Sequence, residues 1–253
     1  MNKEKIYLST IDPKASAVAA QYGLGLEIAE YCTAWNMDEK FRETDILVKN
    51  TIKNCKNLAL HAPFNELFPC AVDPKARALA AERYRQAIDL AKRYGAKKVV
   101  IHGGFHPLIY YPQWYVEQSV AFWKEFLKDD PAVQIVLENV LEKQPQWMLD
   151  VVQKVDDPRL GLCLDVGHVN AYSEIPVMEW LEVLSPYIRH FHIHNNDGSW
   201  DTHSPLWEGN IPIKALLEKA EKLCPDATFT LELPEAEQSV RWLLEKLVWN
   251  WKN

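Results

Sequence analysis

The sequence predicts a single-domain (β/α)8 barrel, the TIM-barrel fold, over residues 1–253. Eight short apolar segments alternate with eight segments of helical pattern, which is the element order of that fold. The length is typical of one such barrel, and no Gly/Ser/Pro-rich linker or shift in composition divides the chain. An open doubly wound sheet is the alternative, but it calls for a glycine-rich turn after the first strand, and residues 9–13 are Ser-Thr-Ile-Asp-Pro.

Each predicted element follows from local pattern and punctuation. Asp12-Pro13 favours a helix start, and Gly23 and Gly95 are typical helix ends. Strands are predicted at 5–9, 24–28, 57–61, 98–102, 134–138, 161–165, 188–194 and 228–232. Helices are predicted at about 15–22, 39–54, 74–94, 113–128, 145–155, 176–185, 211–223 and 236–251. The last helix carries an apolar stripe that favours packing against the barrel, with Trp249 or Trp251 as an oligomer contact in the alternative interpretation.

Composition sets the class of protein. The chain is 48% hydrophobic and 25% charged, which is typical of a globular protein with a sizeable core. No run approaches the roughly 18 apolar residues that span a bilayer, and no signal segment precedes the first strand. The five cysteines are scattered without a CxxC pair, so we expect free thiols in the cytoplasm and no membrane partner.

Six predicted strands share one format, in which apolar residues are followed by a potential metal ligand. Barrel strands converge at their C-terminal ends, so these side chains should meet in one site. The strand-end residues are His61, His102, Glu138, Asp165, His194 and Glu232. Three further candidates follow in the loops, namely His168, Asp201 and His203.

This ligand set predicts a metal centre. Imidazole and carboxylate together suit zinc, manganese or iron. Nine ligands (five His, two Asp, two Glu) exceed the need of one zinc, so one to three ions per chain are compatible with the sequence. His190, His192 and His194 are spaced two apart, so all three lie on one side of the strand. We assign His190 and His192 a supporting role deeper in the barrel, and His106 is a loop residue. Taken alone, His61 or His102 is more readily explained as a buried histidine than as a ligand, and Glu138 and Glu232 can be explained as salt-bridge partners.

The most specific motifs are Asp165-x-x-His168 and the run His194…Asp201-x-His203…Glu208-Gly-Asn. With Leu60-His-Ala-Pro, Ile101-His-Gly-Gly, Leu137-Glu-Asn and Leu231-Glu-Leu, they resemble the xylose isomerase-like TIM-barrel superfamily over essentially the whole chain. That superfamily includes sugar and sugar-phosphate isomerases and epimerases, and abasic-site endonucleases of the endonuclease IV type. The endonuclease resemblance implies a three-zinc cluster held by all nine residues. The isomerase resemblance implies one divalent ion, often Mn²⁺, at the positions of Glu138, Asp165, His194 and Glu232, with the two glutamates moving protons.

The loops of the catalytic face help to choose between these chemistries. Residues 29–39, 62–74, 103–113, 166–176, 195–211 and 233–240 contain no Lys or Arg, and Lys14 and Lys143 are the exceptions elsewhere on that rim. A DNA-binding face needs such cations to neutralise phosphates. The same loops are rich in aromatic residues, which stack on sugar rings but also on unpaired bases.

We therefore expect a sugar or sugar-phosphate isomerase or epimerase acting on a small carbohydrate rather than on nucleic acid. Its catalytic residues would be Glu138, Glu232 and His168, the last holding a substrate oxygen or a second metal. The candidate substrate contacts are Glu27, Trp35, Phe64, Phe105 and Trp207. Glu27 is alternatively interpreted as a support for the metal ligands, and equally as a salt-bridge partner. The alternative hypotheses are a trinuclear zinc phosphoesterase and a metal-binding barrel without catalysis.

Overall fold

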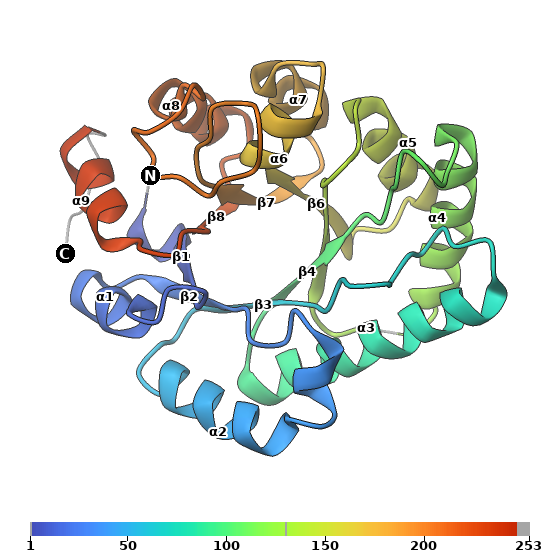
Figure 1. The fold of residues 1–253 in the computed structure, drawn as a ribbon, viewed down its shortest axis with the longest axis horizontal. Coiled ribbons are helices and arrows are strands. Elements are labelled where there is room, and N and C mark those ends of the chain that lie inside the picture. The colour runs from blue at the N-terminus through green and yellow to red at the C-terminus, as the bar shows by residue number, and fades with distance from the viewer. Residues whose placement is uncertain (1, 130, 247–253) are drawn as a thin grey trace.

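A computed structural model describes residues 2–129 and 131–246 as a closed eight-stranded parallel barrel (Figure 1). The strands pair in chain order, and β1 pairs with β8 to close the ring. They are β1 (Ile6–Ser9), β2 (Gly25–Ile28), β3 (Leu58–His61), β4 (Lys98–His102), β5 (Gln134–Glu138), β6 (Leu160–Asp165), β7 (Ile188–Ile193) and β8 (Thr228–Leu231). The predicted fold class is confirmed, and each predicted strand lies within two residues of its observed bounds.

The helices surround the barrel, as the ring of coiled ribbons in Figure 1 shows. They are α1 (Ala15–Tyr22), α2 (Phe41–Ile52), α3 (Pro74–Tyr94), α4 (Pro112–Phe126), α5 (Pro145–Val155), α6 (Val166–Tyr172), α7 (Val177–Leu184), α8 (Ile213–Leu223) and α9 (Glu237–Lys246). Short 3₁₀ turns are η1 (Lys3–Lys5) and η2 (Ala34–Met37). Proline at the first turn of α3, α4 and α5 fits because its missing N–H would have no intrahelical partner there. Gly23 and Gly95 end α1 and α3 in left-handed backbone, with φ of 71° and 77°.

One observed helix was not predicted. Residues 166–172, expected as part of a loop, form α6 directly after β6. The carboxylate of Asp165 accepts the backbone N–H of His168 at 2.7 Å and so caps the helix. The Asp-x-x-His spacing therefore has a structural cause as well as a chemical one, because the cap brings the His168 imidazole back toward the strand end.

The closing helix agrees with the predicted stripe as far as it is described. Leu243 is buried in the core, and Trp242 packs against it. Leu247, Val248, Trp249 and Trp251 lie outside the described residues, so the predicted oligomer contact stays a prediction. Among residues 2–129 and 131–246, no helix is both long and apolar enough to cross a membrane. The five cysteines are free thiols, as predicted.

The barrel interior is polar over much of its length. An apolar layer between strands and helices forms the main core, whereas among residues 2–129 and 131–246 the second, smaller apolar cluster consists of Val100, Val136 and Cys163. Glu27, His190, His192 and Thr230 are fully buried. Buried polar groups are costly unless they are paired, so this interior is expected to serve the chemistry at the barrel mouth.

Candidate metal centre

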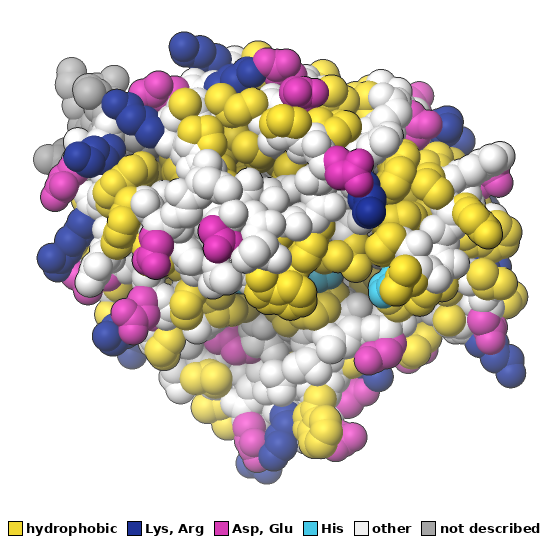
Figure 2. Space-filling model, turned by 45° about the horizontal axis from the view of Figure 1, so that its top comes forward, with side chains coloured by type: hydrophobic (Ala, Val, Ile, Leu, Met, Phe, Trp, Pro, Cys, Tyr) yellow, Lys and Arg dark blue, Asp and Glu magenta, His cyan; other side chains and the backbone are white. Residues whose placement is uncertain are grey.

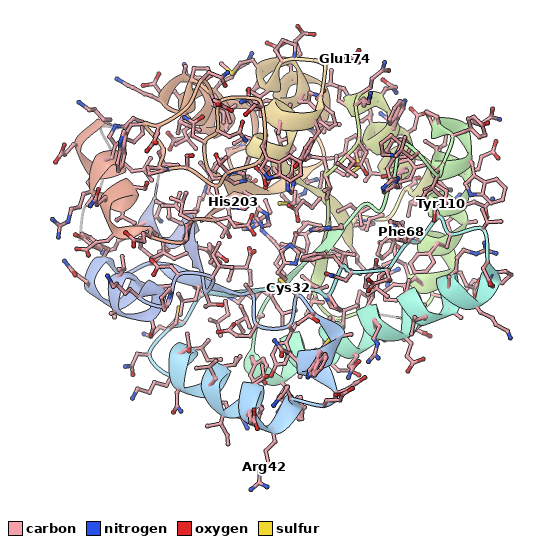
Figure 3. All side chains as sticks on the ribbon, viewed as in Figure 1. Cys32, Arg42, Phe68, Tyr110, Glu174 and His203 are labelled. Atoms are coloured by element: carbon pink, nitrogen blue, oxygen red, sulfur yellow. The ribbon has the colours of Figure 1, made fainter. Side chains whose placement is uncertain are left out.

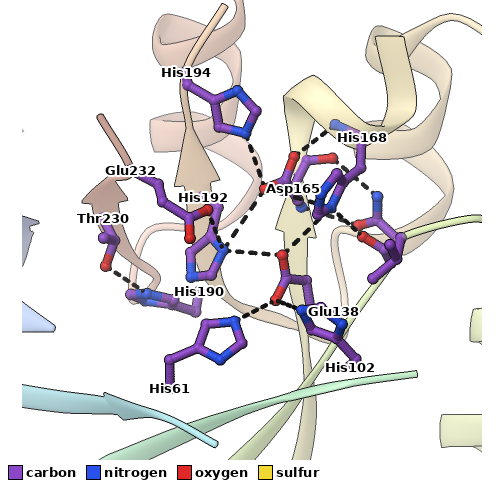
Figure 4. Close-up of polar contacts among 12 residues, drawn as sticks. His61, His102, Glu138, Asp165, His168, His190, His192, His194, Thr230 and Glu232 are labelled. Atoms are coloured by element: carbon purple, nitrogen blue, oxygen red, sulfur yellow. Dashed lines mark hydrogen bonds and ion pairs between the residues drawn. The ribbon is translucent and has the colours of Figure 1, made fainter. Parts of the chain in front are cut away.

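Four ligand-type side chains converge at the C-terminal end of the barrel. Glu138 ends β5, Asp165 ends β6, His192 lies on β7 and Glu232 follows β8. Nδ1 of His192 lies 3.1 Å from Glu138 Oε1, 3.2 Å from Glu232 Oε2 and 3.7 Å from Asp165 Oδ2 (Figure 4). One ligand atom from each of the four residues lies within 4.8 Å of the others, which is a geometry that one metal ion can span. We call these residues the four-ligand group.

A second group adjoins the first and shares Glu138 with it. Nε2 of His61 lies 3.1 Å and Nε2 of His102 3.4 Å from Oε2 of Glu138. Because the other oxygen of Glu138 faces His192, this carboxylate belongs to both groups and would serve both if each held an ion.

A third group lies on the loop after β7 and on α6. Nε2 of His203 lies 2.9 Å and Nε2 of His168 3.3 Å from Asp201 Oδ2, and Nδ1 of His194 lies 3.5 Å from Asp201 Oδ1. His203 has a φ of 47°, a left-handed conformation that costs energy for a non-glycine residue. The loop accepts this conformation while holding His203 stacked on His194 at 4.0 Å and against Asp201. The structure therefore brings all nine predicted ligands into three adjacent groups.

The structure differs from the prediction at strand β7. We expected His194 to lie with Glu138, Asp165 and Glu232, and His192 to have a supporting role. In the observed geometry His192 contacts all three carboxylates. His194 contacts Asp165 alone of the three, at 3.2 Å, and groups with Asp201 and His203. The cause is register, because Asp165 pairs with His192 across a shift in the β6–β7 ladder between Leu162 and Cys163. Alternation correctly put both imidazoles on one side of the strand but could not give their height along the barrel axis.

Burial and charge act against each other in the four-ligand group. Burial alone would raise the pKa of Glu138, but the neighbouring histidines, His192 first among them, outweigh it and hold that pKa well below its ordinary value. Burial would likewise raise the pKa of Asp165 and of Glu232, and neighbouring histidines lower both. All three carboxylates are therefore ionised at neutral pH.

The histidines show the complementary effect. Burial would lower the pKa of His192, but Cys163 and the surrounding carboxylates, Glu138 first among them, raise it well above its ordinary value. The pKa of His203 is raised to about 9 because its contact with Asp201 outweighs burial. Burial instead lowers the pKa of His102 to about 3, so that this imidazole is neutral.

This donor set fits divalent cations. Three ionised carboxylates meet in a buried space, where a cation would balance their charge in place of imidazolium protons. The mixture of imidazole nitrogen and carboxylate oxygen suits zinc and manganese.

The predicted substrate-contacting aromatic residues divide into two kinds. Phe64 is 36% exposed and stacks on His102 with ring centroids 4.3 Å apart, so its other side faces the barrel mouth. Trp35 and Trp207 are exposed on rim segments. Figure 2 shows apolar side chains gathered around the point where histidine reaches this surface. The prediction that Phe105 contacts the substrate is wrong, because this residue is only 4% exposed and packs against Tyr115 and Trp147.

The prediction that Glu27 contacts the substrate directly is also wrong, because its side chain is not exposed. It is fully buried and contacts His190 and His192, which agrees with the supporting and salt-bridge alternatives. Cys32, which was not among the predicted site residues, lies toward the middle of the barrel mouth with His203, whereas Arg42 points outward from α2 (Figure 3). Burial would lower the pKa of His61, but Cys32 and Glu138 raise it, so this thiol belongs to the surroundings of the second group. No spacing pattern in the sequence marks Cys32.

Sequence comparison places this geometry among known proteins. A family model described as the xylose isomerase-like TIM barrel matches residues 18–247. An uncharacterized protein of Methanocaldococcus jannaschii is 30% identical over 195 residues, which cover 73% of this chain and 67% of that protein. Fructoselysine 3-epimerase of Escherichia coli O157:H7 is 24% identical over 197 residues, which cover 69% and 68% of the two chains.

Solved structures give the same architecture. A D-tagatose 3-epimerase-like protein superposes with a TM-score of 0.77 and 25% identity, covering 96% of both chains. A Thermus thermophilus protein, whose crystals were soaked with ZnCl₂, superposes with a TM-score of 0.77 and 26% identity, covering 95% of this chain and 97% of that one.

Proposed function

We propose that this chain, which belongs to the xylose isomerase-like TIM-barrel family, is a divalent-metal-dependent sugar isomerase or epimerase. The observation that carries the proposal is the four-ligand group, in which two glutamates flank one metal position at the barrel mouth. The similarity to a fructoselysine 3-epimerase and to a D-tagatose 3-epimerase-like protein supports the same reaction class.

In this proposal Glu138, Asp165, His192 and Glu232 hold the ion. A bound divalent cation supplies Lewis-acid polarisation of a carbonyl and makes the neighbouring C–H more acidic. Glu138 or Glu232 takes the proton from that carbon as a carboxylate. For isomerisation the same carboxyl returns this proton to the adjacent carbon, and for epimerisation the other glutamate returns a proton that it has first taken from water. Both side chains are ionised at neutral pH, as a general base requires. Glu232 is the more accessible of the two, with a side chain 14% exposed against 1% for Glu138.

The remaining mouth residues position the substrate. His168, which lies on α6 and contacts Asp201, would hold a substrate oxygen or a second metal. Phe64, Trp35 and Trp207 offer apolar faces to a sugar ring. The loops around them lack Lys and Arg, which favours a neutral sugar over a sugar phosphate.

A second candidate function is a trinuclear metal phosphoesterase. The linked ligand groups favour it, since clustered cations can neutralise a phosphodiester and activate a hydroxide. The same lack of Lys and Arg weighs against a nucleic-acid substrate, because phosphates beyond the cluster would have no partners on those loops.

Hydrogen exchange tests the proposal directly. Protein loaded with Mn²⁺ or Zn²⁺ is incubated with a panel of ketoses and aldoses in D₂O, and deuterium at the carbon beside the carbonyl is followed by NMR. We expect exchange in the wild type and in the His106→Ala control, and its loss in Glu232→Gln with metal content checked for each protein. Metal-loaded protein that exchanges no sugar hydrogen but cleaves abasic-site DNA would establish the phosphoesterase instead.

A further inference from the structure

We propose that Glu27 is a positioning residue that directs Nδ1 of His192 toward the metal, at the end of a buried hydrogen-bond chain that begins at Lys98. This inference rests on the metal site of the proposed function. Glu27 contacts Nε2 of His192, on the side of the ring that faces away from the carboxylates of the site and into the barrel.

Both oxygens of Glu27 are engaged by β7 and β8. Oε2 accepts from Thr230 Oγ1 at 2.7 Å and lies 2.9 Å from His190 Nε2. Oε1 lies 3.0 Å from His192 Nε2. Those two atoms are imperfectly aligned, yet among the described residues neither has another hydrogen-bond partner. Since both are fully buried, each depends on the other for its pairing.

The chain continues from His190 toward the N-terminal end of the barrel. Nδ1 of His190 lies 2.6 Å from Thr228 Oγ1, and Lys98 Nζ donates to the same hydroxyl at 2.6 Å and to the Arg189 carbonyl at 2.7 Å. Figure 4 shows Thr230 in contact with His190, and His192 between Glu232 and Glu138.

Hydrogen-bond chemistry fixes the direction of this chain. The carboxylate of Glu27 only accepts, so Nε2 of His190 carries the proton that faces it. Nδ1 of a neutral His190 then accepts from the Thr228 hydroxyl, which in turn accepts from the ammonium of Lys98. The proton on Nε2 of His190 faces Glu27 Oε2 and Thr230 Oγ1, each 2.9 Å away, and the Thr230 hydroxyl itself donates to the same Glu27 oxygen. Glu27 is thereby oriented with Oε1 as the acceptor that faces His192.

The consequence appears at the metal position. Nδ1 of His192 faces Glu138, Asp165 and Glu232, any of which would accept a proton from it. Without Glu27, a neutral His192 would favour the tautomer with hydrogen on Nδ1, and a protonated Nδ1 has no free lone pair to bind metal. Glu27 competes for that hydrogen at Nε2 and leaves the Nδ1 lone pair for the ion.

The test measures metal affinity in the absence of sugar. Glu27→Gln has nearly the shape of the native side chain but one acceptor oxygen, so it cannot accept from both His190 and His192. We expect its affinity for Zn²⁺, measured by competition with a chromophoric chelator, to fall about 10–100-fold, and the visible bands of its Co²⁺ form to shift. Glu30→Gln is the matched control, because Glu30 lies three residues along, is partly buried, and accepts from Thr10 Oγ1 at 2.6 Å outside this chain.

Thr228→Val provides an independent variant that removes only one hydroxyl from the chain. We expect a several-fold loss of Zn²⁺ affinity, with the unfolding curve in EDTA close to that of the wild type. Wild-type affinity and unshifted Co²⁺ bands in Glu27→Gln would overturn the inference, as would an equal loss in Glu30→Gln. If Glu27→Gln does not fold, an unchanged affinity in Thr228→Val overturns it.

These outcomes are separable from those of the proposed function. A wild type that binds metal in a Glu27-dependent way but exchanges no sugar hydrogen would refute the function and keep the positioning role. A wild type that exchanges sugar hydrogen while Glu27→Gln binds metal normally would refute only the positioning role. A wild type that binds neither Zn²⁺ nor Co²⁺ would refute both.

Discussion

A pair of alanine variants can show whether His192 or His194 completes the four-ligand group. His192 supplies one of the four ligand atoms that lie within 4.8 Å of one another, whereas His194 lies in the third group. Structural zinc binding is worth about 10–16 kcal/mol, so one of four ligands carries about 2.5–4 kcal/mol, or a factor of roughly 10²–10³ in affinity. We expect His192→Ala to weaken the tightest metal position by that factor and His194→Ala to leave it within about threefold of wild type.

The assay is competition titration of the apoprotein with a chromophoric chelator, combined with metal analysis per chain. Stability in EDTA gives a second readout, because His192→Ala leaves three buried carboxylates without their central cationic partner. Breaking a buried ion pair costs about 3–5 kcal/mol, so urea denaturation should show a loss of that order. A greater loss of metal affinity in His194→Ala than in His192→Ala would refute the assignment.

Three further outcomes are expected. A Cβ atom at Gly167 would lie 1.9 Å from the His194 ring, so Gly167→Ala should reduce the metal bound per chain without weakening the tightest position; equal metal content by elemental analysis would contradict this. Phe64→Ala should raise the KM for hydrogen exchange several-fold with little change in Tm, whereas Phe105→Ala should destabilise the fold by about 3–5 kcal/mol. The reverse pattern would refute the placement of Phe64 at the barrel mouth and of Phe105 in the core. Burial lowers the pKa of Lys98 to about 8, so between pH 8 and roughly 10.4 the folded state binds fewer protons than the unfolded state. The free energy of unfolding should therefore rise by up to about 3 kcal/mol across that pH range. Urea denaturation at the lowest and highest pH of the range measures this rise, and Lys98→Met should abolish it.

The barrel and most of the candidate site could be predicted from the sequence because both depend on local pattern. Apolar segments alternating with helical segments indicate the fold, and a ligand-type residue at each strand end needs no knowledge of packing. His61, His102, Glu138, Asp165 and Glu232 therefore lie where the strand-end argument put them. The loop residues His168, Asp201 and His203 also join the site, as their spacing indicated.

What remained undetermined depends on contacts between distant segments. Whether Phe105 faces the mouth or the core depends on α4 and α5, which supply Tyr115 and Trp147. Glu27 acquires its surroundings from β7 and β8, more than 160 residues away along the chain. A strand's own residues do not encode which partners its buried polar side chain will meet.

Strand β7 shows the division most clearly. Its alternating sequence determines that His190, His192 and His194 share one side, because successive side chains of a strand point to opposite faces. Only the tertiary structure decides which of them lies level with the carboxylates. That height is set by inter-strand pairing of Asp165 with His192, after the register shift near Cys163. Register is a property of two strands and of the ring they close, so no single segment of the sequence contains it.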